Sequence, residues 1–263
     1  MMQIDAVIVA GFGTTHADAR RLDLAPVRQA VAGAFPGAAC AEAYTSGMVR
    51  AALARRGQPV PDVAAALRQA ACAGARRVLV QPTHVIPGEE YEKVLAAAQQ
   101  CGGLFESLAV GRPLLWAEED YRALALAVAG AYPVAEGEAL VLMGHGSAHA
   151  ANSAYQRLNR VLGELGLRQL TVATVEGTPR LEDALEWLRR GGFGAAALAP
   201  LLLAAGDHAK NDMAGPAAES WQSRLTRQGL KTRALVRGLG RLPAVQQLYK
   251  AHALEACGRE KGA

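Results

Sequence analysis

The chain has 263 residues, enough for two ordinary domains or one large one, and its 51% hydrophobic and 20% charged residues exclude wholesale disorder. The formal net charge is +4, yet no run of lysine and arginine exceeds two residues and no aromatic residues interleave with a basic stripe, so we expect no nucleic-acid partner. The four cysteines are widely spaced, and no apolar stretch is long and clean enough to span a bilayer. We therefore expect a cytoplasmic protein with reduced thiols and no membrane partner.

Short β-rich runs alternate with longer helical patterns along the whole chain, which predicts an α/β fold of parallel sheets flanked by helices. The expected strands are 4–10, 38–44, 77–82, 139–143, 170–175, 195–203 and 232–236. The expected helices are 17–33, 62–73, 89–100, 118–130, 150–164, 181–190, 208–227 and 243–256. A break at 131–138 predicts two domains, an N-terminal one over 1–132 and a C-terminal one over 133–263.

The two halves of the chain resemble each other. Three pairs of segments correspond: 9–14 with 142–147, 45–50 with 175–180, and 82–88 with 200–206. This alignment sets three first-half residues opposite three in the second half: Phe12, Ser46 and Glu90 opposite His145, Glu176 and His208. The first half has twelve extra residues, which we expect in the Pro-containing loop from Arg55 to Asp62. Internal duplication is the favoured interpretation, and a shared fold without shared origin is the alternative.

Three candidate metal ligands each follow an apolar, strand-like run: His145, Glu176 and His208. Because parallel strands end at one edge of a sheet, these side chains are expected to converge there. Two imidazoles and a carboxylate suit a borderline divalent ion and leave coordination positions open. The glycines beside His145 remove bulk and allow a sharp turn after the strand. The sequence thus predicts one metal site per chain, with the first half forming the other wall of a cleft.

Other histidines admit several interpretations. His149 is an alternative ligand, although its place at the start of a helix favours a capping role. His84 follows a strand and is expected either to contact substrate or to be structural. His252 is expected on a helix surface. The segment Gly11–Gly13 lacks the third glycine of a dinucleotide fingerprint, and no P-loop lysine follows it, so no nucleotide site is expected.

The segments that carry these residues resemble a known family. Gly144–Ser147, Val175–Gly177 and Gly206–Gly215 look like the anaerobic sirohydrochlorin cobaltochelatases, class II chelatases of the early cobalt-insertion route to cobalamin. The first-half segments 11–15 and 84–91 are similar to that family too, so the resemblance covers nearly the whole chain. It implies two ferrochelatase-like domains with an active-site cleft between them. Whether the chain assembles into a homo-oligomer is left open.

The resemblance also implies residue roles. His145 would be the proton acceptor, and His145, Glu176 and His208 would hold the metal. The expected substrate contacts lie in the first half: Phe12, Gly13, Thr14, His84 and Glu89. The implied activity is that of a lyase inserting Co2+ into sirohydrochlorin, with Co2+ as a substrate and no organic cofactor.

Three other functions remain open from the sequence. The same ligands would hold Fe2+ for sirohaem synthesis. A metal- or tetrapyrrole-binding protein without turnover, and a metal-assisted hydrolase, would use the same side chains.

Overall fold

The computed structural model describes residues 3–258, so the outermost residues of the two expected domains, 1–2 and 259–263, lie outside the described residues. The chain forms two compact units. The first unit comprises Met1–Trp116 and Val245–Ala263, and the second comprises Ala117–Ala244. Within residues 3–258, no helix combines the length and apolar character needed to cross a membrane.

The first unit is a four-stranded parallel sheet of order β2-β1-β3-β4. Its strands are β1 (Ala6–Gly11), β2 (Ala39–Tyr44), β3 (Arg77–Pro82) and β4 (Ser107–Val110). Its helices are α1 (Ala17–Ala19), α2 (Ala25–Ala32), α3 (Gly47–Arg55), α4 (Val63–Cys72), α5 (Glu89–Cys101) and α10 (Pro243–Ala256). A π-helical segment, 20–24, joins α1 to α2, and a 3-10 turn at 102–104 follows α5.

The second unit repeats this topology, with strand order β6-β5-β7-β8. Its strands are β5 (Glu138–Gly144), β6 (Leu170–Thr174), β7 (Ala195–Pro200) and β8 (Lys231–Ala234). Its helices are α6 (Glu118–Ala131), α7 (Ser153–Glu164), α8 (Leu181–Arg190) and α9 (Trp221–Arg227), with a π-helical segment at 208–213 and 3-10 turns at 150–152 and 239–241. The expected α/β fold of two similar parallel sheets is therefore confirmed.

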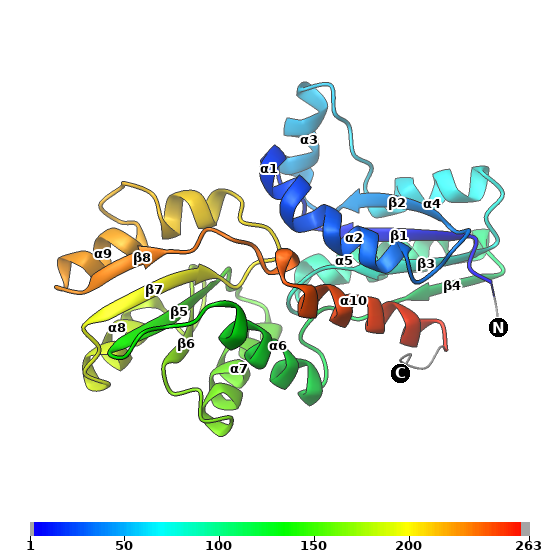
Figure 1. Cartoon of the computed structure of the whole chain (residues 1–263). Helices are drawn as coiled ribbons and strands as arrows, with labels where there is room; N and C mark the ends of the chain where they lie inside the picture. The colour runs from blue at the N-terminus through cyan, green and yellow to red at the C-terminus, as the bar shows by residue number, and fades with distance from the viewer. Residues whose placement is uncertain (1–2, 259–263) are drawn as a thin grey trace. The chain divides into compact units, whose positions relative to one another are not determined.

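The central strands of each sheet are buried on both faces because helices cover both. In the first unit α4 and α5 pack on one face, where Ile8 and Val80 meet Leu67 and Val94, and α2 and α10 lie on the other (Figure 1). In the second unit α8 and α9 cover one face over a core that includes Met143. The central strands β1, β3, β5 and β7 read as almost continuous apolar runs for this reason.

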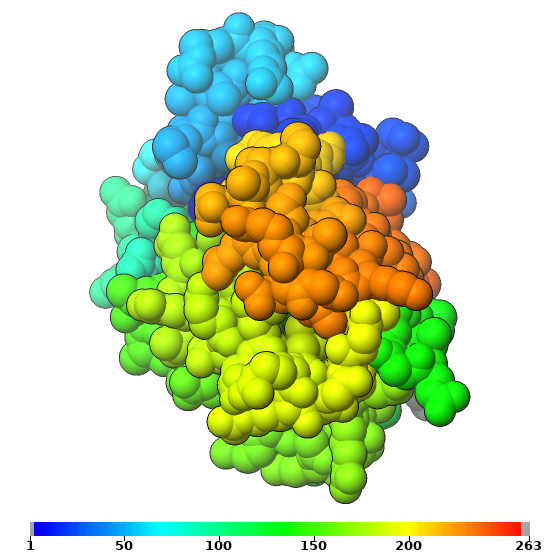
Figure 2. Space-filling view, turned by 90° about the vertical axis from the view of Figure 1, so that its left-hand side faces the viewer, coloured from blue at the N-terminus to red at the C-terminus, as the bar shows by residue number. Residues whose placement is uncertain are grey.

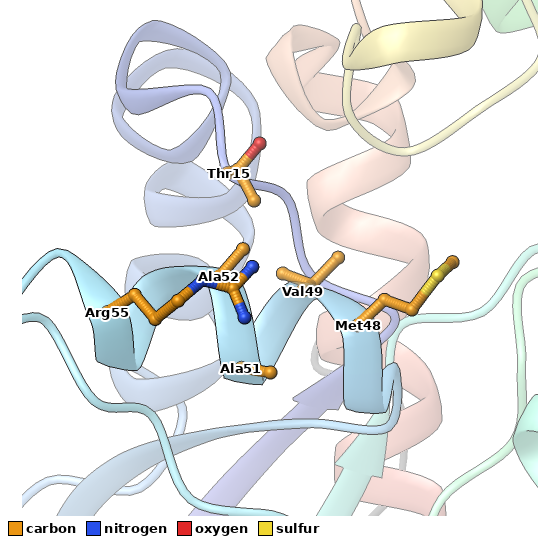
Figure 3. A pocket seen from close by; sticks show the side chains of 6 residues that line it. All are labelled: Thr15, Met48, Val49, Ala51, Ala52 and Arg55. Carbon is orange, nitrogen blue, oxygen red and sulfur yellow. The ribbon is translucent and has the colours of Figure 1, made fainter.

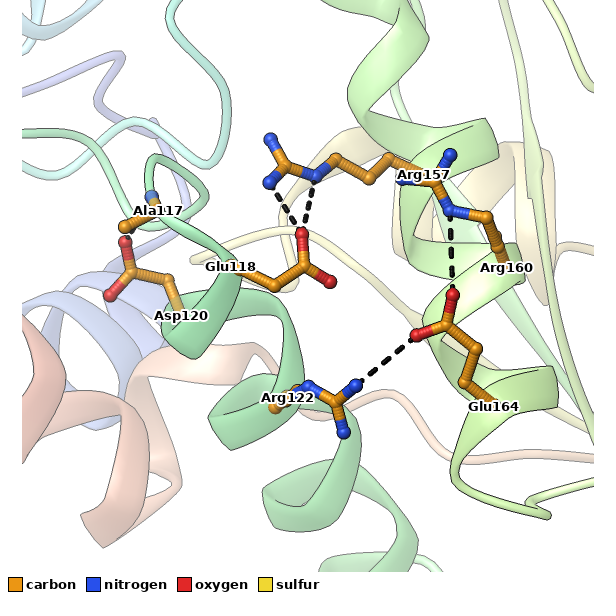
Figure 4. Close-up of polar contacts among 7 residues, drawn as sticks. All are labelled: Ala117, Glu118, Asp120, Arg122, Arg157, Arg160 and Glu164. Atoms are coloured by element: carbon orange, nitrogen blue, oxygen red, sulfur yellow. Dashed lines mark hydrogen bonds and ion pairs between the residues drawn. The ribbon is translucent and has the colours of Figure 1, made fainter.

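The boundaries of the units differ from the expected break at 131–138. The last helix of each half of the sequence packs in the other unit. Helix α6, at the end of the first half, belongs to the second unit, and α10, at the end of the second half, belongs to the first. Helix α6 is tied to α7 by ion pairs of Glu118 with Arg157 and of Arg122 with Glu164, the latter at 3.2 Å (Figure 4). In α10, the Tyr249 hydroxyl donates to the backbone carbonyl of Thr83 at 3.0 Å. The apolar pattern of a helix does not specify which sheet it covers, so the sequence does not reveal this exchange.

Most of the extra residues of the first half lie before the loop in which we expected them. Helix α3 (Gly47–Arg55) was not expected, and it takes up most of the surplus that we placed in the loop 55–62. Ser46, the residue before α3, caps the helix by accepting a hydrogen bond from the Val49 N–H at 3.3 Å. Helix α3 stands out from the body of the first unit at the top of Figure 2. In the second unit α8 begins at Leu181, directly after the loop that carries Glu176.

Candidate metal centre

The three candidate ligands follow three adjacent strands of the second unit. His145 follows the central strand β5, Glu176 follows β6, and His208 begins the π-helical segment 208–213 after β7. Strands β6 and β7 pair with β5 on either side, so all three residues lie at the carboxyl edge of one sheet. Open α/β sheets bind their ligands at this edge.

Backbone hydrogen bonds support the alignment of the two halves. Thr45 N–H donates to the Gly11 carbonyl at 2.8 Å, and Val175 N–H donates to the Gly144 carbonyl at 3.0 Å. One residue further, the Ser46 N–H donates to Phe12 and the Glu176 N–H donates to His145. Phe12 and His145 therefore occupy equivalent backbone positions, as do Ser46 and Glu176.

The two glycines that flank His145 are each required for a different structural reason. A Cβ on Gly144 would lie 2.5 Å from the ring of Tyr155, which is buried beneath the turn. Gly146 has a φ of +80°, and a Cβ there would lie 1.2 Å from the Glu176 carbonyl oxygen. The two loops can approach closely enough for the Glu176–His145 hydrogen bond of 2.7 Å only because Gly146 has no side chain.

The two histidine rings lie together in an edge-to-face arrangement, with centroids 4.7 Å apart and planes at 89°. The Nδ1 atom of His145 is 2.9 Å from the Gly146 carbonyl oxygen, and the Nδ1 atom of His208 is 2.5 Å from a carboxylate oxygen of Asp212. A carbonyl and a carboxylate only accept, so Nδ1 is the protonated nitrogen in both rings. In a neutral ring the Nε2 lone pair is then the one that can bind a metal ion or a proton.

Glu176 lies in the loop next to His145, and the residue is exposed to solvent. Within residues 3–258, no group of three or more His, Cys, Asp or Glu side chains is arranged so that it could hold a metal ion. The structure thus brings His145 and His208 together and places Glu176 on the adjacent loop without completing a three-ligand set.

Sequence reasoning missed two residues that support this edge. Asp212 is the hydrogen-bond partner of His208, and its position four residues later in the same segment was the available signal. Buried Asn152 accepts from the Ser147 N–H at 3.0 Å and donates to the Thr178 carbonyl at 2.6 Å, joining the loops that carry His145 and Glu176. No spacing rule pointed to Asn152, because its partners come from two loops that are distant in sequence.

The structure also places the remaining histidines. The Nδ1 atom of His149 accepts from the Ala151 N–H at 3.1 Å and caps the 3-10 turn 150–152, which confirms the capping interpretation. The expectation that His252 lies on a helix surface is wrong. Its exposed fraction is 1%, because α10 packs into the first unit.

The five expected substrate contacts have different environments in the first unit. Phe12 is 44% exposed, and Glu89 is exposed in the first turn of α5. Gly13 has a φ of +89° and packs against the Tyr44 ring. The hydroxyl of buried Thr14 accepts from the backbone N–H of His16, while His84 is buried with its Nε2 atom 3.4 Å from the Thr45 hydroxyl.

Burial of His84 predicts acid sensitivity of the fold. Its pKa is lowered from 6.5 to about 4, because burial disfavours the charged ring. Between these two pKa values the unfolded chain binds a proton that the folded chain does not. The contribution of neutral His84 to stability is therefore fully present above pH 6.5 and is lost as the pH drops towards 4. We expect this residue to cost up to about 3 kcal/mol of unfolding free energy across that window.

Urea unfolding at pH 7, 6, 5 and 4.5 tests this expectation. The His84→Asn variant should be less stable at pH 7 and should lose less stability than the wild type as the pH falls. Parallel pH dependences in the two proteins would show that His84 does not titrate in this way.

An open pocket of about 410 Å3 lies in the first unit between α3 and the segment that precedes α1 (Figure 3). It is lined by Thr15, Met48, Val49, Ala51, Ala52 and Arg55. None of these described lining residues is a carboxylate, imidazole or thiol, so the pocket offers no metal ligand. The paired imidazoles of His145 and His208 lie elsewhere, at the edge of the second sheet.

Comparisons with solved structures support the fold. The chain superposes on SirB from Bacillus subtilis, determined with Fe3+, with a TM-score of 0.64 and 14% identity, covering 97% of this chain and 96% of the other. It superposes on DR2241 from Deinococcus radiodurans, a multi-domain protein with structural similarity to chelatases, with a TM-score of 0.61 and 22% identity. That match covers 96% of this chain and 55% of DR2241.

Comparisons of sequence reach further. The chain is 34% identical over 253 residues to a sirohydrochlorin cobaltochelatase of Salmonella typhimurium, covering 95% of this chain and 96% of that protein. It is 33% identical over 222 residues to the sirohydrochlorin cobaltochelatase CbiKC of Nitratidesulfovibrio vulgaris, covering 83% and 78%. The family model for cobalt chelatase (CbiK) matches residues 5–258. The chain therefore belongs to the cobalt chelatase (CbiK) family.

Proposed function

We propose that this protein inserts Co2+ into sirohydrochlorin. The observation that carries the proposal is the pair of imidazoles at the carboxyl edge of the second sheet, with centroids 4.7 Å apart and both Nδ1 atoms held by acceptors. Membership of the cobalt chelatase family and the sirohydrochlorin cobaltochelatases among its relatives support it. Co2+ is a substrate here, and no organic cofactor is required.

The chemistry needs both metal binding and proton removal. Insertion of Co2+ releases two pyrrole N–H protons while the pyrrole nitrogens replace the metal's other ligands. We propose that His145 accepts a proton through Nε2, since imidazole transfers protons near neutral pH. His145, Glu176 and His208 would hold Co2+ loosely enough for the macrocycle to remove it. A closed set of four protein ligands would retain the ion.

The macrocycle carries eight carboxylates, and the chain has a net charge of +4, which favours their association. We propose that the first unit supplies substrate contacts, with Phe12 stacking on the macrocycle face. Phe12 is suited to this role because it is exposed at the position that His145 occupies in the second unit.

A spectroscopic assay tests the proposed reaction. Purified protein is mixed with sirohydrochlorin and either Co2+ or Fe2+, with no other cofactor added, and the visible spectrum is followed against a protein-free blank. Cobalt-dependent acceleration over the blank is the expected result. Faster reaction with Fe2+ would favour iron insertion, and tight macrocycle binding without acceleration would indicate a carrier protein.

His208→Ala and Glu176→Ala should both weaken Co2+ binding and leave sirohydrochlorin binding largely unchanged. We expect a loss of at least about tenfold for His208→Ala, since its Nε2 atom would be a direct ligand. The loss should be smaller for Glu176→Ala, because this exposed residue is only adjacent to the histidine pair. Isothermal calorimetry with Co2+ measures both, with the exposed Glu119→Ala as a control. Full cobalt affinity in either variant would exclude that residue as a ligand.

Phe12→Ala should raise KM for sirohydrochlorin about fivefold with little change in Co2+ affinity, corresponding to about 1 kcal/mol of lost stacking. Leu95→Ala is a matched control, because Leu95 is 42% exposed in the same unit against 44% for Phe12. Initial rates at varied macrocycle concentration measure the effect. Equal KM values in the two variants would contradict a contact between Phe12 and the substrate.

A further inference from the structure

We propose that Asp212 is a positioning residue that holds the His208 ring in the tautomer able to bind Co2+. This inference rests on the proposed function, because it assigns Asp212 to a ligand of the substrate metal. Its basis is the contact of 2.5 Å between His208 Nδ1 and the Asp212 carboxylate. The side chains are 36% and 45% exposed, so neither is a buried core residue.

The local fold presents these two side chains together. In the π-helical segment 208–213, Ala209 and Met213 are fully buried and anchor the segment to the core of the second unit. His208 and Asp212 each precede one of these anchors, so they share a face beside the buried one. This arrangement keeps the carboxylate beside the ring.

A second side-chain pair lies next to the first, formed by Asn211 of the segment and Asp207, which directly precedes it. One residue earlier along the helix, Asn211 donates through its side-chain amide to the Asp207 carboxylate at 2.8 Å. Residues 207–213 therefore contain two carboxylates, of which Asp212 contacts the imidazole and Asp207 contacts an amide. This difference provides a matched control for the loss of one negative charge.

The geometry gives Asp212 a role through His208 rather than on the metal. Nδ1 and Nε2 lie on opposite sides of an imidazole ring, so a carboxylate hydrogen-bonded to Nδ1 is turned away from an ion on Nε2. A carboxylate at that place fixes both the tautomer and the ring orientation of a metal-binding histidine. His145 obtains the same tautomer from the Gly146 backbone carbonyl at 2.9 Å, so only His208 depends on a replaceable side chain.

The first experiment reads the tautomer without cobalt. In 15N-labelled, metal-free protein at pH 8, the nitrogen chemical shifts of His208 should report protonated Nδ1 in the wild type. In Asp212→Ala the ring should move towards the Nε2-protonated form, while in Asp207→Ala it should remain as in the wild type. A wild-type ring protonated at Nε2 would overturn the proposal without any variant.

The second experiment measures binding of Co2+ alone by calorimetry. Asp212→Ala should bind Co2+ about 10- to 100-fold more weakly than Asp207→Ala, since loss of such a partner has effects of this size on metal affinity. Thermal unfolding curves verify that both variants are folded. Affinities within twofold of each other would overturn the positioning role.

His208→Ala separates this inference from the proposed function. If it keeps full Co2+ affinity while the wild-type ring is protonated at Nδ1, the proposed ligand set is wrong and the role of Asp212 towards the metal falls with it. If His208→Ala loses affinity and Asp212→Ala does not, the ligand assignment stands and the positioning role alone is overturned.

Discussion

Replacement of His145 by alanine is expected to abolish cobalt insertion and to leave the fold intact. The substitution removes a proposed metal ligand and the proposed proton acceptor together, and loss of a general base alone typically lowers rates by about 10²- to 10⁴-fold. His145 is half-buried on a turn after β5, so its truncation leaves no cavity in the core. The measurement is single-turnover formation of the cobalt macrocycle, followed in the visible spectrum.

A thermal unfolding curve provides the control for His145→Ala. The midpoint should stay within a few degrees of the wild type, because the turn is set by Gly144, Gly146 and the backbone rather than by the ring. Turnover like that of the wild type, together with a normal unfolding curve, would show that another group accepts the proton.

The repeated pattern of strands and helices could be predicted from the sequence because it rests on local signals. Apolar runs before Gly11 and Gly144 identify the central strands, and the matched prolines Pro82 and Pro200 mark the ends of β3 and β7. Those same signals align the two halves to the residue, as the equivalent hydrogen bonds of Ser46 and Glu176 show. The apolar pattern is enough to predict a strand or helix whose packing partners lie close to it in the sequence.

Features that depend on distant partners were not predictable in this way. The edge strand β4 (Ser107–Val110) has four half-buried residues and no clear alternation with its surroundings. The expected helix 208–227 is divided into the π-helical segment 208–213 and α9, with the turn between them passing Gly215, where a Cβ would lie 2.4 Å from the Asn211 carbonyl. Such close approaches become visible only in three dimensions.

The candidate site shows the same division. Local sequence identified His145 and His208, and the pairing of β5 with β7 brings their rings together. The supporting contacts of Asn152 and Asp212 required the structure, because amides and carboxylates in and beside helices have many ordinary uses. Glu176 was chosen by its place after β6, and its role in metal binding remains a prediction.

Gly146→Ala is expected to damage both the site and the stability of the second unit. An alanine Cβ would lie 1.2 Å from the Glu176 carbonyl oxygen, 2.4 Å from its carbon and 2.8 Å from the Thr174 Cβ. None of these atoms belongs to a flexible side-chain end, so the backbone must move. The φ of +80° adds strain that glycine does not experience.

We therefore expect Gly146→Ala to lower the free energy of unfolding by about 2–4 kcal/mol and to reduce cobalt insertion to near the level of His145→Ala. Urea unfolding and the single-turnover assay measure the two effects. Gly163→Ala is the matched control, since Gly163 lies in α7 with no atom within 4 Å of an added Cβ, and alanine there should stabilise the helix by up to about 1 kcal/mol. Turnover and stability in Gly146→Ala equal to those of Gly163→Ala would mean that the loops of His145 and Glu176 can separate without loss of the site, and the requirement for their close approach would be wrong.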